Sequence, residues 1–219
     1  MLLLDDPLRN VDAKLRFEMR LELPRLLAEQ GATVVYVTQD YKEAMALGDR
    51  IAVMQAGRIR QLGTPEEIYL TPAHVETARL FGDPTINLLE VTPVREGREV
   101  TVRLSDVAVA LPGAPEAAVG RPCIVGLRPE ALRFVEPGTP GGVPVTVEAE
   151  TPLNEKTVSL ARTARGREIL VSRPAGTPGP AGGEATIAID GRAALLFDAA
   201  SGERLGSGPG GNTLAGEAA

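Results

Sequence analysis

The feature that most constrains the fold is an abrupt change in glycine and proline content along the chain. Only five of the 24 glycines and five of the 18 prolines lie in residues 1–84, although the whole chain has 219 residues. Because glycine and proline mark turns and interrupt long helices, the two parts are expected to differ in architecture. The boundary is predicted at 81–84, where a helix can end at Gly82 and Pro84 prevents it from continuing.

Residues 1–84 show the alternation of helix and strand patterns that is typical of α/β folds. Residues 2–4 (LLL) and 34–37 (VVYV) are continuous apolar runs, which predict strands buried on both faces of a parallel sheet. Two acids follow the first run, so polar chemistry is expected at the carboxyl end of that strand. The other predicted elements are a helix over 13–29 capped by Asp12, a helix over 41–47, a hairpin over 51–62 and a helix that begins at a capping box at Thr64.

Residues 85–206 instead carry short apolar and β-branched segments separated by glycine and proline turns. This spacing predicts a small all-β barrel or sandwich. Residues 207–219 contain almost no large apolar side chain and are predicted to form a disordered tail. The strand candidates are 91–111, 124–135, 143–150, 157–161, 168–171 and 185–189.

The balance of charge excludes several classes of partner and site. Asp and Glu together number 29 against 23 Lys and Arg, which gives a net charge of −6. Aromatic residues make up 3% of the chain and tryptophan is absent, so nucleic acid is not expected as a partner. A single cysteine, Cys123, excludes an internal disulfide, and a single histidine, His74, excludes chemistry that needs two histidines.

Several short motifs follow one another in the order and spacing of a single protein family. The matching segments are 2–7 (LLLDDP), like a Walker B strand; 9–12 (RNVD), at the place of a D-loop; 37–40 (VTQD), at the place of a switch loop; 49–69; and, in the second part, 87–89 (NLL), 126–130 (GLRPE) and 196–205. The sequence therefore resembles the ATP-binding subunits of ABC importers for sugars, glycerol phosphate and polyamines. These subunits carry a C-terminal OB-like (TOBE) regulatory domain.

The resemblance implies a fold and a set of site residues. Residues 1–84 would form the C-terminal part of an α/β P-loop NTPase (ABC ATPase) domain, and residues 85–206 an all-β OB-like (TOBE) domain. ATP and Mg²⁺ are the implied cofactors. Asp5 would bind Mg²⁺, Asp6 would orient the attacking water and Gln39 would reach the γ-phosphate. The implied role of Asp12 is at the nucleotide interface, in contact with the opposite subunit.

Two of these positions depart from the residues that the family usually has. Asp6 stands where a glutamate is usual, and aspartate is one methylene shorter. A displacement of about 1 Å in a catalytic group can cost about 10²-fold in rate. Gln39 stands where a histidine is usual, and glutamine cannot carry a proton or a positive charge at neutral pH. Both departures predict weak hydrolysis.

The phosphate-binding motifs of the family do not occur in the sequence. There is no GxxxxGK[ST] motif, because the three lysines are Lys14, Lys42 and Lys156 and none of them follows a glycine. The Q-loop and the LSGGQ-type signature of the family are missing as well. We therefore expect this chain to match the C-terminal portion of such a subunit, truncated at the N-terminus within Walker B, and to be deficient in hydrolysis by itself.

The resemblance also implies partners and a location. The partners would be the transmembrane permease subunits, a second ATP-binding subunit and, indirectly, a periplasmic or extracellular solute-binding protein. The location would be cytoplasmic, at the inner face of the cell membrane. The alternative is a non-catalytic module in which the β-domain regulates a transporter or binds a small ligand. The sequence leaves open whether this chain is itself an enzyme.

Overall fold

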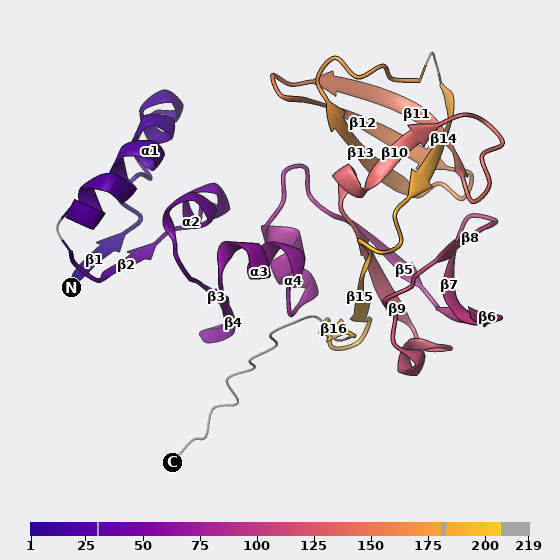
Figure 1. The fold of residues 1–219 in the computed structure, drawn as a ribbon, viewed down its shortest axis with the longest axis horizontal. Coiled ribbons are helices and arrows are strands. Elements are labelled where there is room, and N and C mark those ends of the chain that lie inside the picture. The colour runs from indigo at the N-terminus through magenta and orange to yellow at the C-terminus, as the bar shows by residue number, and fades with distance from the viewer. Residues whose placement is uncertain (30, 181–182, 207–219) are drawn as a thin grey trace. The chain divides into compact units, whose positions relative to one another are not determined.

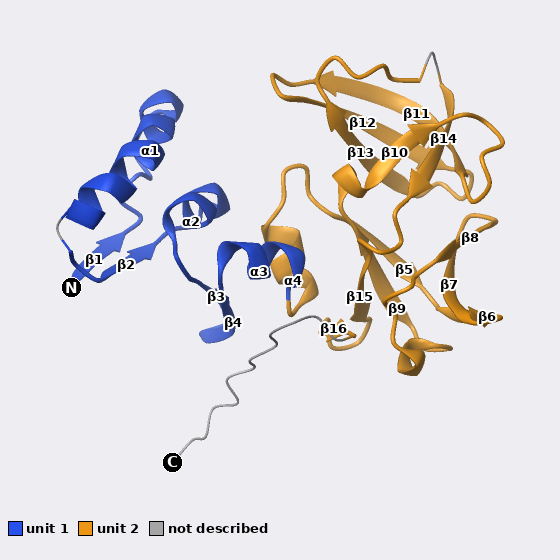
Figure 2. Cartoon of the chain, in the orientation of Figure 1, with its two compact units in different colours: residues 1–72, 210–219 blue, residues 73–209 orange. Residues whose placement is uncertain are grey.

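A computed structural model of the chain describes residues 1–29, 31–180 and 183–206 (Figure 1). The tail predicted over 207–219 lies outside these residues. The chain forms two compact units that divide between Pro72 and Ala73 (Figure 2). The first unit alternates strands and helices, whereas the second is built almost entirely from strands.

The first unit contains every helix and strand predicted for it from the sequence. Its two apolar runs pair as parallel strands, with Leu2 opposite Val34 and Asp5 opposite Val37. This two-stranded sheet does not by itself show a P-loop NTPase domain. The elements are β1 (Leu2–Asp5), α1 (Ala13–Glu29), β2 (Val34–Val37), α2 (Tyr41–Leu47), β3 (Ile51–Gln55), β4 (Arg58–Gly63) and α3 (Pro65–Leu70).

The prediction that β1 and β2 are buried on both faces is wrong for the described chain. Their side chains alternate between half-buried and exposed, and Leu3, Val35 and Val37 on the outer face are 66%, 47% and 53% exposed. Tyr36 on the opposite face hydrogen-bonds to Glu43 of α2, which places helical structure on that face. Parallel sheets are normally covered on both faces. The described residues cover only one face of β1 and β2. The apolar side chains on the other face therefore remain exposed to solvent in this unit.

Local signals set the ends of the hairpin and of α3. The turn between β3 and β4 falls on Ala56 and Gly57, whose φ angles are +48° and +75°. Two left-handed residues match the twist of a two-residue hairpin loop. The Thr64 hydroxyl accepts the Glu67 backbone N–H at 3.2 Å, and the Glu67 carboxylate accepts the Thr64 N–H at 2.8 Å. This reciprocal pair confirms the predicted capping box.

The second unit confirms the predicted all-β organisation. Its strands are β5 (Asn87–Val91), β6 (Val94–Glu96), β7 (Glu99–Leu104), β8 (Val107–Ala110), β9 (Cys123–Leu127), β10 (Leu132–Val135), β11 (Val143–Pro152), β12 (Lys156–Thr163), β13 (Glu168–Pro174), β14 (Glu184–Ile189), β15 (Leu195–Asp198) and β16 (Arg204–Leu205). They form a five-stranded sheet in the order β10–β14–β11–β12–β13, a four-stranded sheet β16–β15–β9–β5 and a three-stranded sheet β6–β7–β8. Three short helices, α4 (Val75–Leu80), η1 (Glu116–Ala118) and η2 (Pro129–Ala131), complete the unit.

Several details of the strand prediction differ from the structure. The segment predicted over 124–135 divides into β9 and β10, because η2 interrupts it, and β5 and β16 are not among the predicted strands. The segment predicted over 91–111 divides into β6, β7 and β8, because the chain turns at Gly97 and Ser105, whose φ angles are +64° and +57°. The sequence does not predict β15, because four apolar and acidic residues are too few to show a strand period. Phe197 in this strand is nevertheless fully buried.

The hydrophobic core of the second unit explains where the units divide. Its main cluster lies among the strands and includes the fully buried Val125, Ile169 and Ile187. A second cluster joins Val75 and Ala78 of α4 to Ile86, Leu195 and Phe197. Because α4 contributes its buried face to this cluster, it belongs to the second unit. The compact units therefore divide before the boundary predicted at 81–84.

The start of α4 is held by the turn before β16. Nδ1 of His74 accepts the Glu76 backbone N–H at 3.1 Å and caps the helix, while Nε2 lies 3.1 Å from the Ser201 carbonyl. The Val75 N–H donates to the Gly202 carbonyl at 2.9 Å. Since Nδ1 accepts, the ring proton belongs on Nε2, where it can be donated to Ser201. The only histidine is thus a structural cap that ties α4 to the C-terminal strands.

Asn87, at the start of β5, satisfies backbone groups of two sheets with one buried amide. Its Nδ2 donates to the Leu127 carbonyl at 3.0 Å and to the Leu170 carbonyl at 2.9 Å, and its Oδ1 accepts the Leu170 N–H at 2.7 Å. Leu127 ends β9 of the four-stranded sheet, and Leu170 lies in β13 of the five-stranded sheet. The side chain therefore ties the two sheets together, and its loss would leave partly buried backbone groups unpaired.

We expect Asn87→Ala to lower the free energy of unfolding of the second unit by about 2–4 kcal/mol, because three hydrogen bonds of a buried amide are lost together. Urea unfolding followed by circular dichroism measures the change. Asn154→Ala, at an exposed turn, is the matched control and is expected to change stability by less than about 0.5 kcal/mol. Equal effects of the two substitutions would contradict the role of Asn87.

The two units are also expected to differ in local stability. Among the described residues of the first unit, the buried apolar side chains are Leu8, Ile51, Val53, Ile68 and Pro72, and α1 has none. Segments with few buried apolar contacts open locally at low free-energy cost. We expect backbone amides of β1, β2 and α1 to exchange roughly a hundredfold faster than those of β9 and β13. Equally slow exchange in both units of the isolated monomer would contradict this.

Candidate functional site

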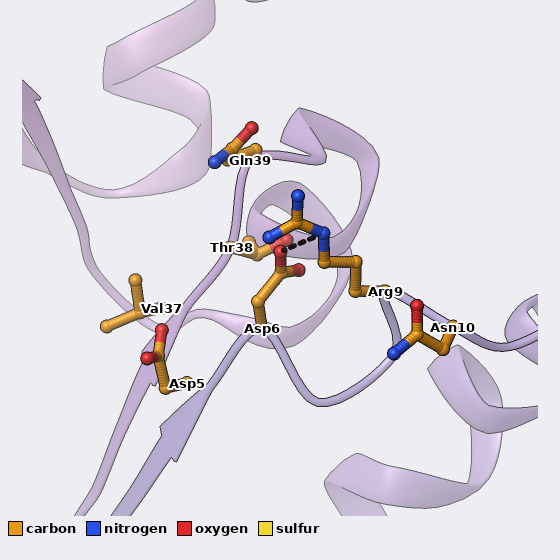
Figure 3. A pocket seen from close by; sticks show the side chains of 7 residues that line it. All are labelled: Asp5, Asp6, Arg9, Asn10, Val37, Thr38 and Gln39. Carbon is orange, nitrogen blue, oxygen red and sulfur yellow. Dashed lines mark ion pairs between the residues drawn. The ribbon is translucent and has the colours of Figure 1, made fainter.

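The carboxyl ends of β1 and β2 form a hollow lined mainly by polar side chains (Figure 3). Because the two strands are parallel, the residues that follow them emerge at the same edge of the sheet, where open α/β folds bind ligands. The hollow has a volume of about 310 Å³. Its lining residues are Asp5, Asp6, Arg9, Asn10, Val37, Thr38 and Gln39.

Asp6 marks the point at which the chain turns away from β1. Its backbone N–H donates to the Val37 carbonyl at 2.7 Å, and its φ of +44° is a left-handed conformation that aspartate tolerates better than most residues. The Arg9 guanidinium reaches toward its carboxylate, with Nε 3.9 Å from Oδ2 (Figure 3). Because the Arg9 side chain is 70% exposed, this ion pair contributes little to stability. Asp5, the last residue of β1, is exposed.

Glu43 of α2 is a buried carboxylate behind the turn that follows β2, and it is 2% exposed. Its Oε2 accepts the Tyr36 hydroxyl at 3.0 Å and the Thr38 hydroxyl at 2.9 Å. Burial, together with the hydrogen bond to this carboxylate, raises the pKa of the Tyr36 phenol. Tyr36 therefore stays protonated and donates to Glu43 at physiological pH.

Asp40 connects α2 to α1. Its Oδ1 accepts the Lys42 backbone N–H at 2.8 Å and caps α2. Its Oδ2 lies 2.6 Å from Nη2 of Arg20 and 3.8 Å from Nη1 of Arg16. This partly shielded ion pair links the two helices, and α1 contributes no buried residue of its own.

Asp12 stands at the start of α1 and does not line the hollow. Its Oδ1 accepts the backbone N–H groups of Lys14 at 3.1 Å and Leu15 at 3.0 Å, which confirms the predicted helix cap. The other three predicted site residues all line the hollow. The structure thus brings together three of the four and places the fourth at a helix terminus.

Sequence reasoning does not identify Glu43 or Arg20 as part of this region. Glu43 lies four residues before Leu47, so the two side chains share one face of α2. An acidic residue on the same face as an apolar one is the sequence signal that could have indicated a buried carboxyl group. Arg16 and Arg20 are also four residues apart. A basic pair of this spacing is usually a solvated helix face, and only the tertiary structure shows that it faces Asp40.

Two family models match the second unit of the chain. A MalK OB fold domain matches residues 82–132, and a TOBE domain matches residues 125–197. The first match begins within the boundary predicted at 81–84, whereas the compact units divide at Pro72. The assignment of the β-rich part as an OB-like and TOBE region is therefore supported by both its strands and its sequence.

Curated importer ATP-binding proteins are similar along most of the chain. It is 38% identical, over 93% of its length, to the sn-glycerol-3-phosphate import ATP-binding protein UgpC of Cereibacter sphaeroides. It is 36% identical, also over 93%, to the lactose transport ATP-binding protein LacK of Rhizobium radiobacter. The chain belongs to the family of ABC importer ATP-binding subunits. The two matches cover 56% and 57% of the relatives, so the chain spans about half the length of the curated relatives it matches.

One more curated relative and one solved structure also match the chain. A third relative, UgpC 1 of Rhizobium johnstonii, is 46% identical over 67% of the chain and is covered over 39% of its own length. Among solved structures, the molybdate-binding protein ModG aligns with 51% of this chain and 95% of its own at a TM-score of 0.39 and 15% identity, a likeness too distant to carry an argument. No helix in the described part of the chain is long and apolar enough to cross a membrane.

The family implies ATP and Mg²⁺, and the donors of the hollow fit a magnesium ion that is shared with a nucleotide. Mg²⁺ is commonly held by one or two carboxylates, with phosphates and waters in the remaining positions. Asp5 and Asp6 supply two carboxylates at the hollow. Within the described ranges, no group of three or more acidic, histidine or cysteine side chains could hold a metal alone. The residues therefore fit a shared metal and do not form a self-contained metal site.

We expect Asp40→Ala to destabilise α2 and its contact with α1 by about 2 kcal/mol, because it removes both a helix cap and the partner of Arg20. Asp40→Asn retains the capping oxygen and is expected to cost about 1 kcal/mol. Hydrogen exchange of the α2 amides measures both. Glu22→Gln, which removes an exposed ion pair with Arg25, is the control and should change the exchange of the α2 amides little. If Glu22→Gln lowered the protection of these amides as much as Asp40→Ala does, the role of Asp40 would be contradicted.

Proposed function

We propose that the chain is the ATP-binding, energy-coupling part of an ABC solute importer. In this proposal residues 1–84 form the C-terminal part of a P-loop NTPase (ABC ATPase) domain, and residues 85–206 form its regulatory OB-like (TOBE) domain. The observation that carries the proposal is the convergence of Asp5, Asp6 and Gln39 on one hollow at the carboxyl ends of two parallel strands. Membership of a family whose relatives are named as import ATP-binding proteins supports it.

Each of these residues has its own role toward Mg²⁺ and ATP. Asp5 would hold the metal with an exposed carboxylate at the end of β1. Asp6 would orient the attacking water, and the side-chain N–H of Gln39 would donate a hydrogen bond to the γ-phosphate. When bound, Mg²⁺ neutralises the charge of the phosphates. Asp12, at the exposed start of α1, contacts the opposite ATP-binding subunit across the nucleotide interface.

The same residues support the proposal that this chain alone is deficient in hydrolysis. Asp6 is a short acid in a left-handed turn, paired with Arg9, so its carboxylate does not reach as far as a glutamate would. Gln39 is neutral, so it can donate a hydrogen bond to the γ-phosphate but cannot bring a transferable proton or a positive charge to it at neutral pH. The sequence also has no GxxxxGK[ST] loop, whose backbone amides and lysine would cradle the phosphates.

The proposed partners follow from the family. They are the transmembrane permease subunits, a second ATP-binding subunit and, through the permease, a periplasmic or extracellular solute-binding protein. The chain would act at the cytoplasmic face of the membrane. The relatives are named for sn-glycerol-3-phosphate and lactose, which makes a small sugar or a polyol phosphate the proposed class of solute.

We expect the purified 219-residue chain to bind Mg²⁺ and ATP only weakly, with perturbed backbone NMR signals at Asp5, Asp6 and Gln39 at millimolar ligand. A dissociation constant of about 1 mM corresponds to only about −4 kcal/mol, as expected where the main phosphate cradle is missing. Asp5→Asn is expected to abolish the Mg²⁺-dependent part of these shifts. Asp49→Asn, at an exposed position outside the hollow, is the matched control and should leave them unchanged.

Two results would count against the proposal. Shifts that spread over the chain, or none at the hollow at millimolar Mg²⁺ and ATP, would contradict a nucleotide site there. Mg²⁺-dependent ATPase activity of the purified chain that Asp6→Ala abolishes would leave the site in place and contradict the deficiency in hydrolysis.

A further inference from the structure

Glu43 is a buried carboxylate to which the proposed function assigns no role. Burying a carboxyl group to 2% exposure is costly unless hydrogen bonds replace its lost hydration. Its position in the first turn of α2 does not require an acid, because Asp40 already caps that helix. The placement of Glu43 therefore depends on what its carboxylate contacts.

The hydrogen bonds of Glu43 converge on the turn that carries Gln39. One oxygen, Oε2, accepts the hydroxyls of Tyr36 at 3.0 Å and Thr38 at 2.9 Å. The Thr38 oxygen in turn accepts the Asp40 backbone N–H at 3.0 Å. The residues on both sides of Gln39 are thus fixed through a chain of hydrogen bonds that ends on the Glu43 carboxylate.

Gln39 itself is exposed and lines the hollow with Asp6 and Arg9 (Figure 3). A second hollow of about 250 Å³ shares these three residues and adds Arg16, Asp40 and Glu43 to its lining. Glu43 and Gln39 therefore line the same second hollow. Because Gln39 is exposed, the position of its side chain depends mainly on the backbone of the turn over 38–40. The hydrogen bonds that hold this backbone therefore also set the position of Gln39.

We propose that Glu43 is a positioning residue, which sets the place of Gln39 at the hollow by anchoring Thr38 and Tyr36. The inference rests on the proposed function, because that function gives the position of Gln39 its role toward the nucleotide. The anchoring of Thr38 and Tyr36 by Glu43 can be measured without nucleotide. The proposed action of Glu43 on Gln39 passes through its hydrogen bonds to Thr38 and Tyr36. The network holds the turn in one geometry before any ligand arrives, which lowers the cost of ordering Gln39 on binding.

The geometry offers a matched pair of substitutions. Because a single oxygen accepts both hydroxyls, Glu43→Gln can keep both hydrogen bonds, whereas Glu43→Met keeps the length of the side chain and removes the acceptor. In the full 219-residue chain without nucleotide, we expect Glu43→Met to speed backbone amide exchange at Asp40 roughly tenfold, the effect of losing one buried hydrogen bond. Glu43→Gln is expected to stay within about twofold of the wild-type rate.

A second pair protects the test if Glu43→Met fails to fold. Thr38→Val keeps the shape of the side chain and removes both its hydrogen bonds, whereas Thr38→Ser keeps the hydroxyl. We expect Thr38→Val to reproduce the faster exchange at Asp40 and Thr38→Ser to restore the slow rate. Amides later in α2, over 44–47, are expected to remain unchanged in both pairs.

Each outcome decides the matter. Faster exchange at Asp40 that Glu43→Gln and Thr38→Ser rescue supports the positioning role. Unchanged exchange in Glu43→Met and Thr38→Val, or a uniform rise across α2 without rescue, overturns it. A separate titration of the wild-type chain with Mg²⁺ and ATP reports on the hollow: if no signal moves there while the rescue holds, the proposed function fails and the anchoring of Gln39 stands.

Discussion

Parallel pairing of β1 with β2 is the constraint on which the candidate site depends. The register that sets Asp5 opposite Val37 brings the residues after both strands to one edge of the sheet, although more than thirty positions separate them in the sequence. Asp6 extends the pairing with its own N–H and then turns into a left-handed conformation. A register shifted by one residue would move the acids to the other face and away from Gln39.

The support for this edge comes from polar contacts more than from a hydrophobic core. Glu43 anchors Tyr36 and Thr38, and Asp40 links α2 to Arg20 of α1. Such contacts specify a geometry, but they stabilise a unit less than apolar burial does. The β-rich second unit is stabilised mainly by a hydrophobic core, which lies among its strands. Asn87 also connects two of its sheets by hydrogen bonds to backbone groups of Leu127 and Leu170.

Much of the local structure follows from the sequence because it rests on neighbours in the chain. Asp12 and Thr64 cap helices through backbone groups two or three residues away, and the Ala56–Gly57 turn needs only two left-handed residues. The order of strands and helices follows from apolar periodicity in the same way. The sequence could not show that one face of β1 and β2 stays exposed in this chain, because burial depends on what packs against a strand.

By itself, therefore, the sequence determined the strand and helix order, the caps, the change to a β-rich second part and the family to which the chain belongs. Only the tertiary structure decided that Asp5, Asp6 and Gln39 share one hollow while Asp12 caps a helix away from it. The tertiary structure alone placed a buried carboxylate, Glu43, behind the turn. The reason is physical: periodicity and capping act over a few residues, whereas a site depends on strand register and side-chain contacts between distant segments.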